Sequence, residues 1–461
     1  MNPAVSFAPE RLRAILERGL QEVGAHPAGY CIALSGGLDS TALAAALANS
    51  GAPHGLALRA IHVDHRLHPD SAQWSAHCRQ LAERLGVPCE IVAVDARPAA
   101  GESPEAAARA ARYDALAARL QPREVLLTAH HGDDQLETVL LQSLRGGGLS
   151  ALAGIRPVTP FAAGWLARPL LGFTRAELEA WARAHGLTWL EDPSNADPRF
   201  DRNYLRLEIL PRLRARWPAA AVTVGRVAEQ AAEALDVVTD VAAADLGTLV
   251  DGETLVLERL EHLPVARQRL ALRAWLRSRG FAAPPAATLE ALRRDMLQAD
   301  GDRMPVTRWP GAVVRRYRGS LFAAASDAPA DWQPGRWLPG EPFGLGSDGR
   351  LELVAATGVG LSRERLAGGL EVVPRPEGGV FKPAGHPHHR EVRKWLQEHG
   401  VLPWRRAALP FVRADGEIVA IGDLAYGGAL AAAPGEPSWR VVWRDRPTLT
   451  ESEARAGRVT R

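Results

Sequence analysis

The chain has 461 residues and a formal net charge of only +2. This length predicts two or three domains, because single hydrophobic cores rarely extend beyond about 250–300 residues. The small net charge means that any nucleic-acid partner must bind a local basic surface. The first residues contain no long apolar run, so the sequence predicts neither a signal peptide nor a membrane span and favours a cytoplasmic location.

Three cysteines occur, Cys31, Cys78 and Cys89, and none of them belongs to a Cys-x-x-Cys pair. This pattern argues against a disulfide framework, an iron–sulfur cluster or a structural zinc site. We expect the three to be small buried residues in a reducing compartment.

Strand and helix patterns alternate through the first half of the chain. Short apolar runs typical of buried strands occupy residues 30–34, 60–63, 91–94 and 125–128. Helical patterns lie between and after them at residues 41–47, 71–85, 104–120 and 133–144. This order predicts a doubly wound α/β domain, in which helices cover both faces of a parallel sheet and the ligand binds at the carboxyl ends of the strands.

Composition divides the chain further, and no internal repeat is present. After the α/β domain, Ala-, Leu- and Arg-rich helical sequence is followed by two strand patterns at 313–316 and 321–324. A stretch rich in Pro, Gly and Trp then precedes short strands and one helix at 390–399. The predicted parts are the α/β domain at 1–216, a mostly helical domain at 217–326, a linker at 327–346, a small α+β domain at 347–445 and a disordered tail at 446–461.

The strongest local motif lies between the first strand and the first helix. Glycines there let the backbone approach phosphate oxygens, and the start of the helix offers free N–H groups and a positive dipole. Asp39 would repel phosphate unless a cation lay between them, so we expect Mg²⁺ to bridge Asp39 and the polyphosphate. An ordinary glycine-rich turn is the alternative. The predicted nucleotide-binding residues of the loop are Ser35, Gly36, Gly37, Leu38, Asp39 and Ser40.

The same domain contains no lysine, since the only two in the chain are Lys382 and Lys394. A kinase-type phosphate loop needs a lysine after its last glycine. Transfer of the γ-phosphoryl group is therefore disfavoured.

A second motif, at residues 129–138, marks the passage from the fourth strand into a helix. Asp134 and Glu137 are three residues apart, which predicts a carboxylate pair on one helix face. His130 and His131 leave the strand toward the same rim, where we expect catalysis or ATP contacts. Core or cap roles, or a metal site of two histidines and one carboxylate, are the alternatives. Asp133 is expected to cap free N–H groups of its own helix.

Two arginines, Arg109 and Arg112, are three residues apart on a predicted helix and share one face. Beside a nucleotide, a guanidinium group in this position can bind the α-phosphate. A solvated helix face is the alternative.

The loop at residues 35–40 resembles the pyrophosphate-binding loop of the N-type ATP pyrophosphatases, the Rossmann-like PP-loop superfamily. Those enzymes adenylate a carbonyl oxygen and then displace AMP with a nitrogen or sulfur nucleophile. Together with residues 129–138, further stretches resemble the tRNA(Ile)-lysidine synthetases in their long three-domain form. They are LRGGGLSALAGI at 144–155, RPLL at 168–171, Glu191-Asp192-Pro193-Ser194-Asn195-x-Asp197, Arg202-Asn203-x-x-Arg206, KWL at 394–396 and PWR at 403–405.

The resemblance implies ligation of free L-lysine to the wobble cytidine in the CAU anticodon of tRNA(Ile), with ATP and Mg²⁺ as cofactors. Cytidine O2 attacks the α-phosphate and releases pyrophosphate, after which the lysine ε-amine attacks C2 and expels AMP. For this chemistry the expected catalytic residues are Asp39, Arg112, His130, His131 and Asp134, with Arg109 and Arg112 on the nucleotide and Asp39 on the metal.

We expect Asp134 and Glu137 to hold the lysine ammonium and to accept its proton, with Arg202 or Arg206 on the α-carboxylate. A pair of carboxylates suits the compact ammonium group of lysine, which acts as a point charge, and one carboxylate can accept its proton. The planar guanidinium group of free arginine would need a wider and flatter arrangement of acceptors. Coordination of Mg²⁺ by both acids is the alternative.

Basic residues outside the α/β domain are expected to contact tRNA. Three arginines recur every fourth residue on one helix, and further basic residues crowd the last domain beside His386, His388 and His389. Solvated basic faces, or adventitious metal binding by the histidines, are the alternatives. The predicted tRNA-binding residues are Arg145, Arg269, Arg273, Arg277, Lys382, Arg393 and Lys394, with Arg390 nearby.

Three other functions are alternatives to lysine ligation. A cytidine-thiolating relative would need cysteines at the active rim, and amidotransferase-like relatives lack the stretches at 145–154 and 195–206. A non-catalytic RNA-binding module holding ATP would not need Asp39, Asp134 and Glu137. The oligomeric state stays open, with a homodimer as one alternative.

Overall fold

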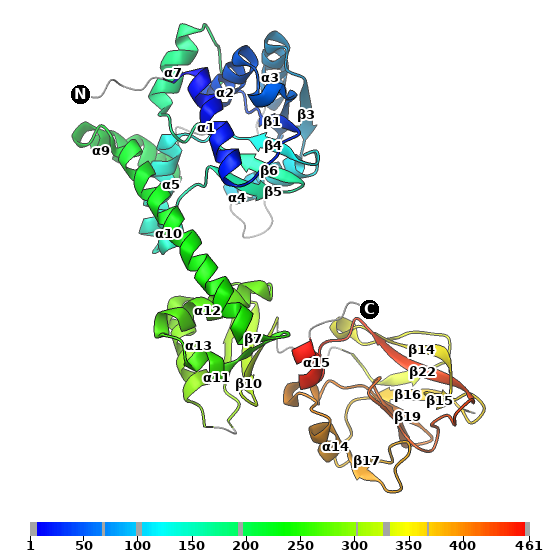
Figure 1. Ribbon diagram of the computed structural model, residues 1–461. Helices are drawn as coiled ribbons and strands as arrows, with labels where there is room; N and C mark the ends of the chain where they lie inside the picture. The colour runs from blue at the N-terminus through cyan, green and yellow to red at the C-terminus, as the bar shows by residue number, and fades with distance from the viewer. Residues whose placement is uncertain are drawn as a thin grey trace. The chain divides into compact units, whose positions relative to one another are not determined.

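The computed structural model divides into two compact units, residues 1–238 and 239–461 (Figure 1). Helix α10 (Ala220–Leu249) begins in the first unit and ends in the second. No helix in the described ranges is long and apolar enough to cross a membrane. The structure describes residues 7–66, 70–97, 104–191, 197–300, 303–325, 332–366 and 368–456.

A six-stranded sheet forms the centre of the first unit, in the order β3-β2-β1-β4-β6-β5. Every neighbouring pair is parallel except β5 and β6, which form an antiparallel hairpin at the edge. The chain moves outward from β1 to β3 and then returns to the other side of β1 at β4, so the strand order reverses between β1 and β4. The strands are β1 (Gly29–Ala33), β2 (Leu58–Asp64), β3 (Cys89–Ala93), β4 (Glu124–Leu127), β5 (Val158–Phe161) and β6 (Gly164–Ala167).

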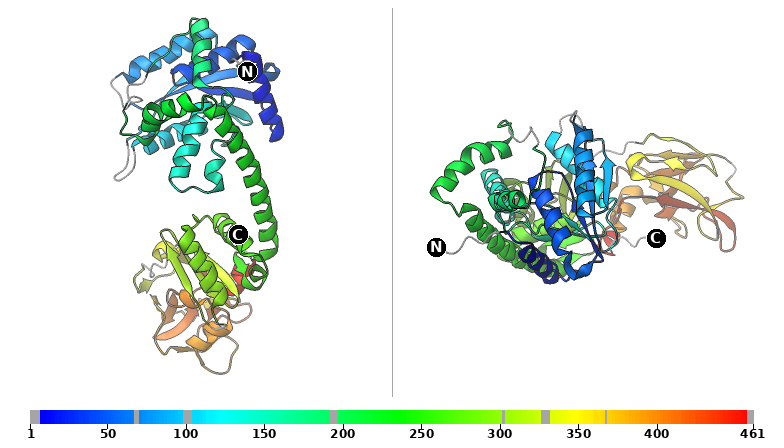
Figure 2. Two further views of the ribbon diagram at one scale, coloured as in Figure 1. Left: turned by 90° about the vertical axis from the view of Figure 1, so that its left-hand side faces the viewer. Right: turned by 90° about the horizontal axis from the view of Figure 1, so that it is seen from above.

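Helices cover both faces of this sheet (Figures 1 and 2). Tyr30 and Ile32 of β1 pack in one core with four helices, whereas Cys31 between them packs in a second core with α4 (Pro104–Ala117). Alternating side chains of one strand point to opposite faces, so both faces are buried. The doubly wound α/β fold is thereby confirmed. The four helices of the first face are α1 (Pro9–Glu22), α2 (Leu38–Ser50), α3 (Ser71–Leu85) and α7 (Arg175–Ala184).

The remaining helices of the first unit follow β4 and the hairpin. A π-helical turn, η3 (Leu205–Ile209), joins two of them, and such turns are often found at functional sites. These helices are α5 (Gly132–Leu144), α6 (Leu149–Leu152), α8 (Asp201–Tyr204) and α9 (Leu210–Arg216).

The second unit begins with helices packed on a five-stranded sheet, in the order β7-β8-β11-β10-β9. The expectation of a mostly helical part anticipated β10 and β11 but missed the other three strands. The elements are α11 (Leu257–Glu261), α12 (Val265–Ser278), α13 (Ala286–Gln298), β7 (Val250–Asp251), β8 (Thr254–Val256), β9 (Val306–Trp309), β10 (Ala312–Tyr317) and β11 (Ser320–Ala324).

The last part of the chain is rich in strands, with one seven-residue helix, α14 (Val392–Glu398), packed into its core. Two sheets have the orders β12-β16-β19-β20-β21 and β13-β14-β22-β15, and β17 pairs with β18. The strands are β12 (Gly335–Trp337), β13 (Phe343–Gly344), β14 (Arg350–Thr357), β15 (Leu361–Ser362), β16 (Leu370–Val373), β17 (Val380–Phe381), β18 (Arg390–Glu391), β19 (Phe411–Ala414), β20 (Glu417–Ile421), β21 (Ala425–Tyr426) and β22 (Pro437–Arg444).

Two expectations about this part need correction. The predicted linker is not a linker over 332–346, because Trp332 and Trp337 are buried in the core and β12 and β13 join its sheets; residues 327–331 lie outside the described range. The predicted disordered tail is ordered over 446–456, where it forms α15 (Glu451–Ala456) and buries Leu449 and Ala454; residues 457–461 lie outside the described range. Apolar side chains find tertiary partners there that local composition does not reveal.

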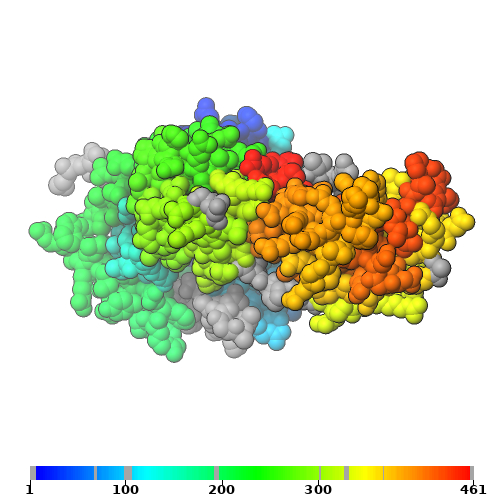
Figure 3. Space-filling model, turned by 90° about the horizontal axis from the view of Figure 1, so that it is seen from below, coloured from blue at the N-terminus to red at the C-terminus, as the bar shows by residue number. Residues whose placement is uncertain are grey.

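The two parts of the second unit lie side by side (Figure 3). The Trp404 ring packs edge-on against Phe322, with centroids 5.3 Å apart, and against Tyr317 at 6.0 Å. Arg318 pairs with Glu451 at 3.2 Å.

Candidate active site

The glycine loop follows β1 and leads into α2. Gly36 has φ +82°, and a Cβ there would lie 2.8 Å from Cys78 Sγ, so both the backbone and the space require glycine. Ser35 and Ser40 close the loop through a 2.9 Å hydrogen bond between their hydroxyls, and Ser40 also donates to the Gly37 carbonyl. No side chain caps the first N–H groups of α2, which leaves them free to bind an anion.

Asp39 lies in the first turn of α2, and its Oδ1 is buried without a hydrogen-bond partner. Burial raises the pKa of Asp39, and Asp134 raises it further, while His131 opposes this shift. The described residues contain no cluster of three or more acidic, His or Cys side chains able to hold a metal. The unpartnered Oδ1 of Asp39 is the kind of oxygen that Mg²⁺ accepts as a single carboxylate ligand beside phosphate oxygens, so this residue fits the expected metal.

His131 connects the glycine loop with α5. It is the N-cap of α5, where its Nδ1 accepts from the Asp134 backbone N–H while Asp134 Oδ2 accepts from the His131 N–H at 3.0 Å. Its Nε2 lies 3.6 Å from Asp39 Oδ1 and 3.5 Å from Asp134 Oδ2. The side chain is only 2% exposed. The structure thus brings three predicted site residues together where the strand order reverses.

Asp133 does not cap its own helix, contrary to expectation. His131 occupies that position, and Asp133 instead accepts a 2.7 Å hydrogen bond from the Arg175 backbone N–H at the start of α7. Its other oxygen accepts from Arg214 at 2.5 Å. Asp133 therefore fastens α7 and α9 to α5.

Four predicted lysine-binding residues form one network. Glu137 is 1% exposed and accepts from Arg206 at 2.8 and 2.9 Å and from Arg202 at 2.9 Å. Asp134 lies 3.4 Å from Arg206 and 3.6 Å from Arg202. Burial opposes ionisation of Asp134, but His131, His130 and Arg202 outweigh it and lower its pKa. Two carboxylates thus face two guanidinium groups carried by α8 and η3.

Arg109 and Arg112 flank Tyr113, with guanidinium carbons 4.9 and 5.5 Å from the ring centre. Arg112 is half-buried, and burial lowers its pKa. His130 is close to both arginines, and burial lowers its pKa to about 3, so it is neutral at physiological pH. Its Nδ1 lies 2.9 Å from the Thr128 hydroxyl.

Arg168 is part of the same basic group but was not predicted as a site residue, although it begins the RPLL stretch. It follows β6 directly, and Arg109 and Tyr113 lie within electrostatic range. Its position after a parallel strand was the signal that could have identified it.

The predicted tRNA-binding residues lie on the surface, several of them in ion pairs. Arg145 pairs with Asp201 at 2.7 Å, Arg269 with Glu290 at 2.7 Å, and Lys394 with Glu391 at 3.5 Å. Arg277, Lys382 and Arg393 are exposed, and Arg273 is half-buried.

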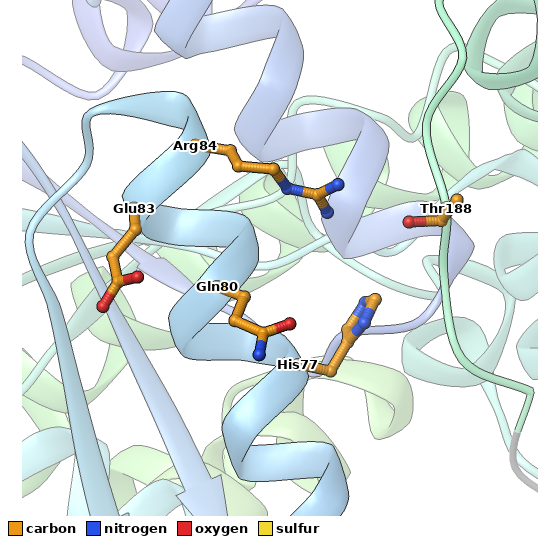
Figure 4. A pocket seen from close by; sticks show the side chains of 5 residues that line it. All are labelled: His77, Gln80, Glu83, Arg84 and Thr188. Carbon is orange, nitrogen blue, oxygen red and sulfur yellow. The ribbon is translucent and has the colours of Figure 1, made fainter.

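A separate depression lies between α3 and the segment that carries Thr188 (Figure 4). His77, Gln80 and Arg84 extend from α3 toward that segment, and Glu83 points to the other side. None of the predicted site residues lines it.

Known proteins resemble most of the chain. A PP-loop domain family matches residues 10–213, the TilS substrate binding domain matches 255–322, and the TilS substrate C-terminal domain matches 370–443. The tRNA(Ile)-lysidine synthase of Methylococcus capsulatus is 42% identical over 91% of this chain and 97% of its own length. Those of Alkalilimnicola ehrlichii and Pseudomonas aeruginosa are 43% and 39% identical, over 94% and 96% of this chain and 97% and 98% of their own lengths.

The parallel sheet and its Ser-Gly-Gly-x-Asp-Ser loop, matched over residues 10–213, define a PP-loop enzyme that uses ATP. The sequence identity to relatives over nearly their full length identifies one family among the PP-loop enzymes. The chain belongs to the tRNA(Ile)-lysidine synthase family, a group of ligases.

Proposed function

We propose that the chain ligates free L-lysine to C2 of the wobble cytidine in the CAU anticodon of tRNA(Ile), consuming ATP and giving lysidine. One observation carries the proposal. The glycine loop and the α5 carboxylates meet through His131, 3.6 Å from Asp39 and 3.5 Å from Asp134. A phosphate site and a site for a cationic nucleophile therefore adjoin, as adenylation followed by amine attack requires.

In the first step, cytidine O2 attacks the α-phosphorus, the bond from that phosphorus to the bridging oxygen breaks, and pyrophosphate leaves. The hydroxyls of Ser35 and Ser40 and the free N–H groups of α2 hold the pyrophosphate part. Arg109 and Arg112 stabilise charge on the α-phosphate. Neutral His130 donates or accepts one hydrogen bond at the rim without adding positive charge.

Mg²⁺, when bound, would supply charge neutralisation between Asp39 and the phosphates. The buried, unpartnered Oδ1 of Asp39 supports this assignment. His131 orients Asp39 and Asp134 relative to each other.

In the second step, the lysine ε-amine attacks C2, the C2–O bond breaks and AMP leaves. Asp134 holds the ammonium group and accepts one proton from it, while Arg202 or Arg206 binds the α-carboxylate. Free L-lysine carries one carboxylate and two ammonium groups, so its entry exchanges ion-pair partners within the network and adds one positive charge. Glu137 contributes mainly by holding the two arginines.

We place tRNA contacts beyond the anticodon on the second unit, where exposed basic residues include Arg277, Lys382 and Arg393. Arg269 is already paired with Glu290 and contributes less.

Cytidine thiolation is disfavoured by the state of the cysteines. Burial raises the pKa of Cys31 and of Cys78 to about 12, so both thiols stay protonated, and Cys89 lies at the start of β3, at the end of the sheet away from the loop.

The test is AMP release from purified protein with ATP, Mg²⁺ and tRNA(Ile) transcript, with and without L-lysine. Lysine-dependent AMP release and a lysine-containing nucleotide in the digested tRNA are expected. Repeated turnover, with continued pyrophosphate release in the absence of lysine, would reject the proposal. Ornithine and a tRNA(Met) transcript are matched controls.

A further inference from the structure

Arg168 lies at the carboxyl edge of the parallel sheet, as do the other groups of the site. It follows β6 directly, and β6 pairs in parallel with β4, which pairs with β1. Two strand spacings, about 10 Å, therefore separate it from the glycine loop after β1. Arg168 belongs to the same rim as Ser35 but cannot be part of the loop itself.

The Arg168 side chain is held but only partly satisfied. Its Nη1 donates a 2.7 Å hydrogen bond to the Arg156 carbonyl, while its Nε is buried without a partner. Arg156 is in turn fixed by Asp236 of α10 through hydrogen bonds of 2.7 and 2.8 Å. The guanidinium is thus locked in one orientation with an unused donor.

Three arginines gather around Tyr113 without a carboxylate among them. Arg109 and Arg112 contact its ring, and Arg168 interacts with the Tyr113 side chain both electrostatically and through a hydrogen-bonding contact. Among the residues that the structure describes, no acidic side chain forms an ion pair with any of the three. Burial lowers the pKa of Arg112 and of Arg168, as expected for cations that lack a counterion.

Arg109 is exposed, whereas Arg112 and Arg168 are partly buried, and partly buried cations that lie close together are costly unless an anion joins them. Guanidinium groups match the oxygens of a phosphate, and bidentate geometry makes such bonds strong. We infer that Arg168 completes, with Arg109 and Arg112, a site for a single phosphate group that is separate from the glycine loop. This inference rests on the proposed function for its ligand, which is either the α-phosphate of ATP or a phosphodiester next to the target cytidine.

The decisive variant is Arg168→Gln, which removes the charge but keeps an amide donor for the Arg156 carbonyl. Two affinities are measured on the full chain without lysine: Mg·ATP alone, and an anticodon stem-loop RNA with the CAU sequence alone. Loss of a charged hydrogen bond predicts about 10- to 100-fold weaker binding of one probe. If only the affinity for Mg·ATP falls, the ligand of Arg168 is the α-phosphate. If only the affinity for RNA falls, and the slope of log K against log salt decreases by about one, the ligand is the phosphodiester.

Arg168→Lys is expected to recover part of the lost affinity, because it restores a point charge but not the fork. Arg183→Ala, which removes an exposed arginine of α7 that pairs with Glu179, is the control and should bind both probes like wild type. The site would be refuted if Arg168→Gln, with an unchanged thermal midpoint, bound both probes within about twofold of wild type. If the wild-type chain showed no lysine-dependent AMP release, the proposed function would be refuted instead. The two binding affinities would still decide the role of Arg168.

Discussion

Arg206 holds Glu137 in a bidentate ion pair, with Nε 2.8 Å from Oε1 and Nη2 2.9 Å from Oε2. Because Glu137 is 1% exposed and also accepts from Arg202, its oxygens are occupied before any ligand arrives. The network is therefore preorganised around Glu137, and the longer arginine contacts of Asp134 are the reason why the proposed function assigns the lysine ammonium to Asp134.

Glu137→Gln should separate the two steps of the reaction. Loss of the charge loosens Arg202 and Arg206, which are about one-third exposed, so the cost in stability is on the order of 2 kcal/mol. Pyrophosphate release with tRNA should persist, while the KM for lysine rises by about tenfold or more. Glu179→Gln, on the surface of α7, is the control. Loss of pyrophosphate release with unchanged lysine affinity would assign Glu137 to the metal.

Asp39→Asn should abolish the metal requirement together with most of the activity. The unpartnered Oδ1 no longer offers a charged ligand, and several kcal/mol of charge neutralisation are lost, which lowers the rate of pyrophosphate release about 100-fold or more. The measurement is pyrophosphate release as a function of Mg²⁺ concentration. Asp114→Asn, on the exposed side of α4, should behave as wild type. Wild-type release by Asp39→Asn would exclude the bridging role.

Gly36→Ala should damage the loop more than its backbone angle alone explains. A left-handed backbone costs about 1–2 kcal/mol for alanine, and the new Cβ would also lie 2.8 Å from Cys78 Sγ. Gly186→Ala is a matched control, since Gly186 has φ +64° and open space around it. Both variants should lose stability in denaturant titrations, but only Gly36→Ala should also bind Mg·ATP weakly. Equal ATP affinities would contradict this account.

His130 should make the protein less stable in mild acid. Its pKa is about 3 in the folded state, whereas an unfolded histidine titrates near about 6.5, so the unfolded chain binds more protons between these values. The free energy of unfolding should therefore fall as the pH drops from 7 to 5, with about 1–2 kcal/mol due to His130. Denaturant titrations of His130→Gln should lack this part of the decrease. His185→Gln, an exposed site, should retain it.

Basic residues of the second unit should contribute to the salt dependence of the tRNA affinity. Arg393 and Lys394 are exposed on α14, and loss of each phosphate contact lowers the slope of log K against log salt by about one. Arg393→Ala with Lys394→Ala should thus weaken binding of full-length tRNA(Ile) but not of the anticodon stem-loop. Arg294→Ala, which removes an exposed arginine of α13, is the control. Unchanged slopes of log K against log salt would show that these residues do not contact tRNA phosphates.

Features set by local geometry could be predicted from the sequence. The apolar runs at 30–34 and 125–128 form parallel strands β1 and β4, and the loop at 35–40 follows β1, because a buried parallel strand needs apolar side chains on both faces. The proximity of Asp134 to Glu137 follows from three-residue helical spacing. Domain boundaries remain a prediction, since the division at residue 238 falls within α10.

The amino-acid sequence by itself determined that the glycine loop and the two histidines reach the carboxyl edge of the sheet, because each directly follows a recognisable strand, whereas Arg168 was missed because β6 before it was not predicted. Only the tertiary structure decided their partners. Glu137 meets Arg202 and Arg206 across 65 and 69 residues, and Asp133 meets Arg214 across 81. Contacts at such separations depend on how α8, η3 and α9 pack against α5, and no local pattern of charge or hydrophobicity encodes that packing.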